Sequence, residues 1–222
     1  MLYLYNTLAG EPSLRLEGDD HRYIFKVRRH KVDDTLYLRN LEDSLIYRYL
    51  IIAMDRRNTT LMLQESQALE VKAKHDLHIG WCVIDPKSVE KVLPSLNEIG
   101  VAKITFIYCD RSQKSFTPDF KRWEKILLNS SQQSGRSVMM ELEMAESLEA
   151  FLADNPQSYL LNFSEHTLSS GMPVGTIVVG CEGGVTEDEV ALFDPEKIVG
   201  FDTPLVLKSE SAVCALASKI LL

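Results

Sequence analysis

Two turns near the C-terminal end of the chain could form a ligand site from bare main chain. Residues 178–185 read Val-Val-Gly-Cys-Glu-Gly-Gly-Val, an apolar strand that runs into a turn with paired glycines. Residues 205–212 read Leu-Val-Leu-Lys-Ser-Glu-Ser-Ala, a short apolar strand that runs into a helix start. Because Gly183 and Gly184 lack a Cβ, a ligand could contact the N–H and C=O groups of their turn directly. On local sequence alone, a plain strand-to-helix turn is the commoner explanation.

Charged residues beside these turns could do acid–base or anion chemistry. Arg136 follows a helix stop at Gly135 and offers a fork of donors that suits a phosphate or a developing anion. Glu182 lies in the glycine turn, and Lys208 and Glu210 flank the start of the last helix. The helix dipole alone would favour Glu210, and Arg136 could equally be a surface residue. Neither a Gly-Lys-Ser/Thr sequence nor a dinucleotide glycine fingerprint is present, which disfavours a phosphate loop.

A basic cluster near the N-terminus is a candidate for contact with nucleic-acid phosphates. Its five basic side chains, with no acid among them, are Arg22, Lys26, Arg28, Arg29 and Lys31. The net charge of −8 argues against binding of nucleic acid by overall charge, but the charge is unevenly distributed. The first 70 residues contain ten Lys/Arg and eleven Asp/Glu, whereas the remaining residues contain fourteen Lys/Arg and twenty-one Asp/Glu. Because salt screens charges beyond roughly 8 Å, a local patch can contact phosphates in an acidic protein. A solvated face is the commoner alternative.

The composition is that of an ordinary globular chain. The 222 residues suffice for one large domain or two small ones, and 45% are hydrophobic and 25% charged. The longest apolar run, residues 49–54, is too short to span a membrane, and early acidic residues argue against a secretory signal, so a cytoplasmic location is expected. The cysteines and histidines lack metal-ligand spacing, so no metal is expected. Cys82 and Cys109 are predicted to be small core residues.

Two kinds of region must position these residues. The first 70 residues predict a small barrel or an antiparallel sheet, because short runs rich in Ile, Leu, Tyr and Thr alternate with polar turns. These runs cover residues 35–39, 45–54 and 59–63. Asp19 and Asp20 would cap a helix over residues 21–29, with a strand over residues 23–27 as the alternative.

Beyond residue 71 the predicted elements alternate between strand and helix. The strands are expected over residues 77–84, 103–108, 137–142, 159–163, 176–181 and 198–201. The helices are expected over residues 86–100, 115–133, 144–153 and 209–221, with Thr117 capping the second and a capping box at residues 186–189. This alternation indicates a mostly parallel sheet that is covered on both faces. Ligands bind beyond the carboxyl ends of such strands, where the glycine turn lies.

Taken in order, these segments resemble the bacterial 16S ribosomal RNA uridine-N3 methyltransferases, a branch of the SPOUT superfamily, over nearly the whole chain. The segments that carry the resemblance are His21-(x5)-Val27-Arg28-Arg29-(x2)-Val32-Asp33-Asp34, Glu98-Ile99-Gly100-Val101, Arg111-Ser112, Gln133-Ser134-Gly135-Arg136, Gly180-Cys181-Glu182-Gly183-Gly184 and Leu207-Lys208-Ser209-Glu210-Ser211-Ala212.

The resemblance implies an α/β chain with a small PUA-like β-barrel over residues 1–70 that binds RNA. Residues 71–222 would form a knotted, mostly parallel SPOUT methyltransferase domain. S-adenosylmethionine is the implied cofactor, held by three loops, and the implied assembly is a homodimer that acts on 16S rRNA or the 30S subunit. The cofactor-binding residues implied are Leu161, Asn162, Gly180, Glu182, Gly183, Gly184, Phe201, Leu205, Val206, Leu207 and Ser209. The RNA-binding residues implied are the basic cluster, Arg111 and Lys208.

The implied reaction transfers a methyl group to N3 of a uridine, which is a poor nucleophile until it loses its proton. Arg136 is expected to position RNA or to stabilise the N3 anion, and Glu182 or Glu210 could take the proton. Val206 and Leu207 would edge an apolar slot for the adenine. Alignment of the reacting atoms is expected to dominate, without a metal.

Several positions depart from the family pattern. Cys181 stands where the family has Pro, and Thr203 and Leu205 stand where Gly and Arg are common. Asp33 replaces a glycine, and Ser95 falls where a lysine is usual. The lost Arg and Gly leave open a non-catalytic RNA-binding or ribosome-assembly factor on a degenerate scaffold. A methyltransferase of the same fold that acts on another RNA is a further alternative, because substrate choice depends on shape that one sequence does not display.

Overall fold

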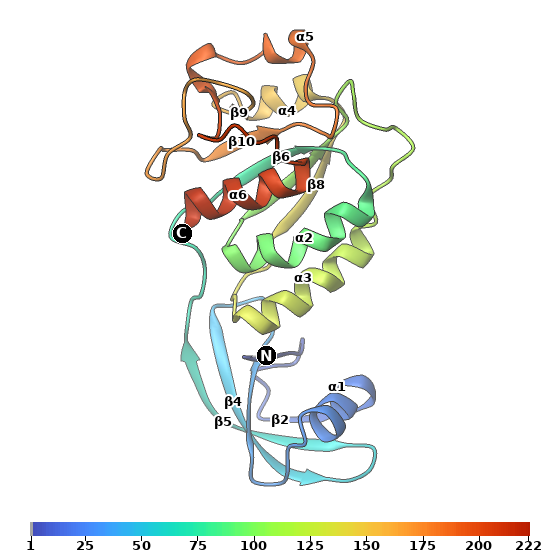
Figure 1. Cartoon of the computed structure of the whole chain (residues 1–222). Coiled ribbons are helices and arrows are strands. Elements are labelled where there is room, and N and C mark those ends of the chain that lie inside the picture. The colour runs from blue at the N-terminus through green and yellow to red at the C-terminus, as the bar shows by residue number, and fades with distance from the viewer. Residues whose placement is uncertain (1) are drawn as a thin grey trace. The chain divides into compact units, whose positions relative to one another are not determined.

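The computed structural model describes residues 2–222, which divide into two compact units whose elements are labelled in Figure 1. The N-terminal unit comprises the residues up to Lys72 together with Ser131–Val138. The C-terminal unit comprises Ala73–Ser130 and Met139–Leu222. The division after Lys72 lies close to the expected one at residue 70. That residues 131–138 belong with the N-terminal unit is not predicted by the sequence.

The N-terminal unit is built on a five-stranded sheet in the order β1-β3-β4-β5-β2. Its strands are β1 (Leu4–Tyr5), β2 (Ser13–Leu16), β3 (Thr35–Arg39), β4 (Leu45–Met54) and β5 (Thr59–Ala68). Only the β1–β3 pair is parallel, and two register shifts between β4 and β5 mark bulges, which bend a sheet. Because β1 and β2 are its edges, the sheet of residues 2–222 does not close into a barrel by strand pairing. The predicted strands are confirmed, although β5 is longer and the short β1 and β2 were not predicted.

A helix precedes β3, as the first of the two alternatives predicted. α1 (Gly18–Arg22) continues into a π-helical segment (Tyr23–Val27) whose Ile24 is buried in the core of this unit. The helix begins earlier than expected, so Asp19 and Asp20 lie in its first turn and Glu17 occupies the N-cap position. Both carboxylates still suit the positive end of the helix dipole, which explains why they signal a helix start.

The C-terminal unit is built on a six-stranded sheet in the order β11-β9-β10-β6-β7-β8, in which every pair is parallel. Its strands are β6 (His78–Cys82), β7 (Lys103–Ile107), β8 (Glu141–Ala145), β9 (Tyr159–Leu161), β10 (Thr176–Val179) and β11 (Ile198–Val199). The expected mostly parallel α/β architecture of this unit is thus confirmed.

Helices connect these strands. They are α2 (Pro86–Ile99), α3 (Phe120–Ser134), α4 (Leu148–Asp154), α5 (Glu187–Val190), a 3-10 turn η2 (Pro195–Lys197) and α6 (Ser209–Leu221). As predicted, α2 ends at a left-handed Gly100 with φ 114°. The capping box at Thr186 and Glu189 is also confirmed. The expected cap of α3 at Thr117 is wrong, because the helix starts at Phe120 and the Asp119 carboxylate accepts the Arg122 N–H at 3.1 Å.

Side chains that alternate along the central strands cover both faces of the sheet. Trp81 and Phe106 stack with their ring centroids 5.9 Å apart, and Phe106 also contacts Trp123 of α3. His78 of the same strand β6 lies edge-on to Phe151 of α4. Because neighbouring strand positions point to opposite faces, Trp81 and His78 reach different helices. This two-sided burial is why the strands read as apolar runs.

Cys82 and Cys109 are joined by a disulfide, with their Cα atoms 5.7 Å apart. Both are buried, as predicted, but the sequence did not predict that they pair. Cys82 ends β6 beside Ile107, the last residue of the neighbouring β7, and Cys109 follows two residues later. Adjacent parallel strands therefore bring the two sulfurs together, although they lie 27 residues apart in the sequence.

Main chain packs directly against main chain at Gly200. Its N–H donates to the carbonyl oxygen of His166 at 2.8 Å, and its own carbonyl accepts the Leu168 N–H at 2.7 Å. A Cβ at Gly200 would lie 2.8 Å from the Ser164 carbonyl oxygen and 3.0 Å from that of Asn162, too close for real atoms. The absence of a side chain thus lets the main chain of the loop after β9 pack directly against the main chain at the end of β11.

Candidate active site

A cavity of about 720 Å³ opens in the C-terminal unit at the carboxyl end of its sheet. Its lining comes mainly from three segments: residues 161–164 after β9, residues 179–185 after β10, and residues 200–210 between β11 and the first turn of α6. This is the edge of a parallel sheet where ligands bind, as the sequence predicted. The volume falls within the roughly 300–1,000 Å³ range of small-molecule sites.

The structure brings all the predicted cofactor-binding residues together around this cavity. Its lining includes Leu161, Asn162, Gly180, Glu182, Gly183, Gly184, Phe201, Leu205, Val206, Leu207 and Ser209. Lys208, which was predicted to contact RNA, lines the cavity as well. So does Glu210, which was predicted to take the proton. The roles of these residues stay predictions, because proximity to a cavity does not identify a ligand. Prediction from sequence missed Ser88, Phe163 and Ser164, which also contribute to the lining.

One side of the cavity, residues 180–185, is a tight turn that we call the glycine wall. The Gly184 N–H donates to the Cys181 carbonyl oxygen at 2.9 Å, and Gly184 has a φ of 71°, which disfavours any residue with a Cβ. The Cys181 thiol donates to the Gly184 carbonyl oxygen at 3.4 Å. Burial raises the pKa of this thiol, so it stays protonated at neutral pH. Cys181 thus closes the turn with its main-chain carbonyl and its thiol.

A buried hydroxyl ties the glycine wall to the start of α6. The Ser209 hydroxyl donates to the carbonyl oxygen of Gly180 at 2.5 Å and accepts the Trp81 indole N–H at 2.8 Å. Both hydrogen-bonding directions of this hydroxyl are therefore used within the protein. Ser209 was predicted to bind the cofactor, and the geometry makes it a support for the cavity.

The facing side, residues 201–208, is an irregular segment that we call the apolar wall. Leu205 and Val206 are 71% and 76% exposed, which is unusual for residues of this kind within one loop. Among residues 2–222, the hydrogen bonds of residues 202–207 are local, from Thr203 N–H to the Phe201 carbonyl and from Leu205 N–H to the Thr203 hydroxyl. The wall therefore presents unpaired apolar surface to the cavity.

Arg136, the predicted catalytic cation, is not among the residues that line this cavity. It belongs to the N-terminal unit and is 6% exposed. Its Nε–H donates to the Val138 carbonyl oxygen at 2.9 Å, and its own carbonyl accepts the Tyr3 hydroxyl at 2.8 Å. Burial lowers the pKa of its guanidinium, which still leaves the group charged at neutral pH. Its catalytic role stays a prediction.

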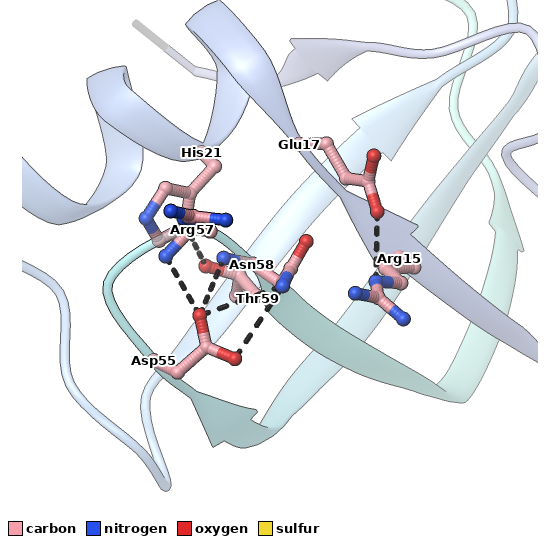
Figure 2. Close-up of polar contacts among 7 residues, drawn as sticks. All are labelled: Arg15, Glu17, His21, Asp55, Arg57, Asn58 and Thr59. Carbon is pink, nitrogen blue, oxygen red and sulfur yellow. Dashed lines mark hydrogen bonds and ion pairs between the residues drawn. The ribbon is translucent and has the colours of Figure 1, made fainter.

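The predicted basic cluster runs from the end of α1 through the π-helical segment into the turn that follows. Arg22, Lys26, Arg28, Arg29 and Lys31 are all exposed. Figure 2 shows the contact that fixes this helix to β5: a ring nitrogen of buried His21 hydrogen-bonds the Thr59 hydroxyl at 2.8 Å.

The turn before Thr59 is itself ordered by Asp55. One oxygen of its carboxylate accepts the N–H groups of Arg57 and Asn58 at 2.7 and 2.8 Å, which holds the pKa of Asp55 below its usual value (Figure 2). The sequence placed His21 only within a motif and did not reveal this anchoring role.

Arg111, predicted to contact RNA, contacts the glycine wall instead of lining the cavity. One terminal nitrogen of its guanidinium donates to the carbonyl oxygens of Gly183 and Val185, at 2.7 and 3.2 Å. In the part of the chain that the structure describes, no cluster of three His, Cys, Asp or Glu side chains could hold a metal ion. None of its helices has the length and apolar character needed to cross a membrane.

Comparison with protein families gives a match over most of the chain. A family model described as an RNA methyltransferase domain matches residues 71–221. The chain is also 37% identical, over 98% of its own length and 98% of the relative's, to ribosomal RNA small subunit methyltransferase E of Helicobacter pylori strain J99. A second relative of the same name, from Rickettsia conorii, is 25% identical over 100% of this chain and 95% of its own.

A solved structure shares the fold of the whole chain. It is ribosomal RNA small subunit methyltransferase E from Neisseria gonorrhoeae, bound to S-adenosyl methionine, with a TM-score of 0.80. The match covers 98% of this chain and 95% of that one, at 16% sequence identity. Identity this low supports the likeness of fold alone.

Proposed function

Since this chain belongs to the RNA methyltransferase family, we propose that it transfers the methyl group of S-adenosylmethionine to small-subunit ribosomal RNA, at N3 of a uridine. The observation that carries the proposal is the cavity at the carboxyl end of the parallel sheet, where three loop segments gather every predicted cofactor-binding residue. The enzyme would work where ribosomes are assembled, in the cytoplasm.

The residues of the cavity fit such a cofactor. The glycine wall offers main-chain N–H and C=O groups, and the absence of Cβ atoms at Gly183 and Gly184 leaves them accessible. The exposed side chains of Val206 and Leu207 supply an apolar slot for a planar base. When bound, S-adenosylmethionine supplies an electrophilic methyl group on a sulfonium.

The chain's own residues must remove the N3 proton of the uridine or stabilise the N3 anion that its loss leaves. Glu182 is exposed and Glu210 is half-buried in the first turn of α6, and both line the cavity, so either carboxylate can accept a proton there. Such a base contributes on the order of 10²–10⁴-fold. Lys208 at the same rim would hold an RNA phosphate. Alignment of the methyl group and N3 contributes at most roughly 7–11 kcal/mol.

RNA capture falls to the N-terminal unit in this proposal. Its exposed basic cluster would contact phosphates, which makes affinity fall steeply with salt. We assign the unit to the PUA-like type, in support of which its bulged sheet curls around Ile24 of the neighbouring helix. The finer parts of the proposal are a trefoil knot in the C-terminal unit and a homodimer.

The test is a methylation assay with labelled S-adenosylmethionine on 30S subunits and on naked 16S rRNA. We expect label at N3 of one uridine, located by nucleoside mass spectrometry, and the same modification missing from a deletion strain. Label on another RNA alone would show a methyltransferase with a different substrate. Calorimetry that detects neither S-adenosylmethionine nor its demethylated product would favour a non-catalytic assembly factor.

A further inference from the structure

We infer that Arg111 is a positioning residue that holds the glycine wall in shape for the cofactor, and not a contact for RNA. The inference deepens the proposed function and rests on it. Arg111 follows β7 and reaches the glycine wall from outside, since it does not belong to the lining of the cavity.

The contact between Arg111 and the glycine wall is extensive. Its Nη1 donates to the carbonyl oxygens of Gly183 and Val185, which lie on either side of the left-handed Gly184. Its aliphatic stem also packs beneath the turn, because a Cβ at Gly183 would lie 3.4 Å from both Cβ and Cδ of Arg111. The two carbonyl groups are therefore turned toward the arginine by a charge-assisted hydrogen bond each.

A second tie joins the same two segments. The Asp110 N–H donates to one oxygen of the buried Glu189 carboxylate at 2.8 Å, and the other oxygen accepts the Thr186 N–H at 2.8 Å. The Thr186 hydroxyl lies 3.3 Å from the Asp110 carboxylate, to which it donates. The glycine wall is thus held at Gly183 and Val185 by Arg111, and the residues directly after it are held by Asp110.

The segment that carries Arg111, residues 109–112, is itself held in place by a disulfide and by hydrogen bonds. The disulfide fixes Cys109 to Cys82 at the end of β6. The Ser112 N–H donates to the Cys109 carbonyl oxygen at 3.0 Å, and the Cys109 N–H donates to the Ser112 hydroxyl at 3.2 Å. Residues 109–112 therefore form a closed turn with Arg111 near its tip.

This arrangement predicts an effect on cofactor affinity. With both carbonyl groups held from outside, the turn is already ordered when the ligand arrives, and binding does not bear the cost of ordering it. Without the guanidinium, Gly183 and Gly184 regain the freedom of glycine, and part of the binding energy is used to restore the turn. A merely structural arginine would instead change folding stability and leave ligand affinity alone.

The experiment compares the full-length wild type with Arg111→Ala, Arg111→Lys and the control Lys114→Ala. Lys114 is an exposed cation three residues further along the same loop, and it makes no hydrogen bond or ion pair in residues 2–222. Calorimetry gives the Kd for S-adenosylmethionine and for its demethylated product. A salt series without cofactor gives the affinity for 16S rRNA, and thermal unfolding without ligand gives stability.

We expect Arg111→Ala to weaken cofactor binding about tenfold, as loss of a charge-assisted contact would. Arg111→Lys should recover about half of that effect on a logarithmic scale, because an ammonium can still reach one carbonyl. Neither variant should change apo stability, rRNA affinity or the salt slope relative to Lys114→Ala. An unchanged cofactor Kd would overturn the inference, and so would an rRNA salt slope that falls by about one in Arg111→Ala but not in the control. A wild type that binds no cofactor would instead refute the proposed function, and the inference with it.

Discussion

The glycine wall and the apolar wall face the same cavity but are held by different kinds of contact. Arg111 and Ser209 fix the glycine wall through hydrogen bonds from two other segments, and the Gly184 N–H closes the turn within the wall by donating to the Cys181 carbonyl oxygen. In the described residues, the apolar wall between Asp202 and Leu207 has only local hydrogen bonds and leaves large apolar side chains exposed.

This difference divides the work of binding between the two walls. A main-chain wall can bind through directional hydrogen bonds only if its carbonyl and amide groups are oriented beforehand. An apolar wall contributes through buried area, which has no required direction, so it can adjust around the ligand. We therefore expect the first wall to be the same with and without ligand, and the second to become ordered on binding.

We expect the largest loss of cofactor affinity from a substitution that distorts the glycine wall. Gly184→Val places a β-branched residue at φ 71°, where backbone strain of about 1–3 kcal/mol arises or the turn changes shape. Cofactor affinity should fall on the order of 100-fold by calorimetry. Gly171→Val is the matched control, because Gly171 is also left-handed, at φ 92°, but lies outside the cavity. Equal losses in both variants would show that strain in general, and not the wall, matters.

A smaller loss should follow when the support behind the glycine wall is removed. Ser209→Ala leaves the buried Trp81 indole N–H and the Gly180 carbonyl without this partner, which costs about 1–3 kcal/mol. Chemical denaturation should show that loss of stability, together with weaker cofactor binding. Ser211→Ala, on the exposed side of the same helix, should change neither quantity. Full stability in Ser209→Ala would mean that water replaces the hydroxyl.

The apolar wall should respond in the opposite way to truncation. Val206→Ala removes side-chain surface that is exposed in the free protein, so folding stability should not change. Cofactor affinity should fall by about 1 kcal/mol, and the heat-capacity change of binding should become less negative. Leu192→Ala serves as the control, since Leu192 is exposed but outside the cavity. A drop in melting temperature for Val206→Ala alone would contradict an adaptable wall.

The smallest expected effect is a change in the alkylation rate of Cys181, whose thiol reports on the order of the glycine wall. Burial raises the pKa of its thiol above the ordinary value, so the reactive thiolate is scarce at pH 7.5 and increases only in alkaline solution. Alkylation by iodoacetamide, followed by peptide mass spectrometry, should therefore be slow at neutral pH and slower still with cofactor. Rapid alkylation at pH 7.5 would indicate that the turn opens.

Much of this architecture can be predicted from local sequence. The apolar runs of β3 and β4, the left-handed Gly100 and the capping box at Thr186 each have a local cause, which is burial, missing Cβ or a side-chain hydrogen bond. The loops of the cavity could be predicted because parallel strands place their carboxyl ends at one edge.

Other features depend on partners that are distant in sequence. β1 has only two residues and exists through pairing with β3, and the Leu2 N–H donates to the carbonyl oxygen of Gln132. The disulfide between Cys82 and Cys109 follows from strand order. Arg111 carries no local sign of its partners at Gly183 and Val185, which lie more than 70 residues away. The family resemblance implied an RNA contact for Arg111, whereas the structure shows a contact within the protein.

The close main-chain packing at Gly200 should make this position intolerant of amino-acid substitution. Every substitution there adds at least a Cβ atom, which would lie 2.8 Å from the Ser164 carbonyl oxygen, and main chain cannot rotate aside as a flexible side chain can. Because Gly200, Asn162 and Ser164 all line the cavity, pushing the segments after β9 and β11 apart would distort the cavity. In a saturation library selected for activity, we expect glycine to be the sole survivor at this position, while Leu205 and Val206 a few residues away accept many apolar replacements.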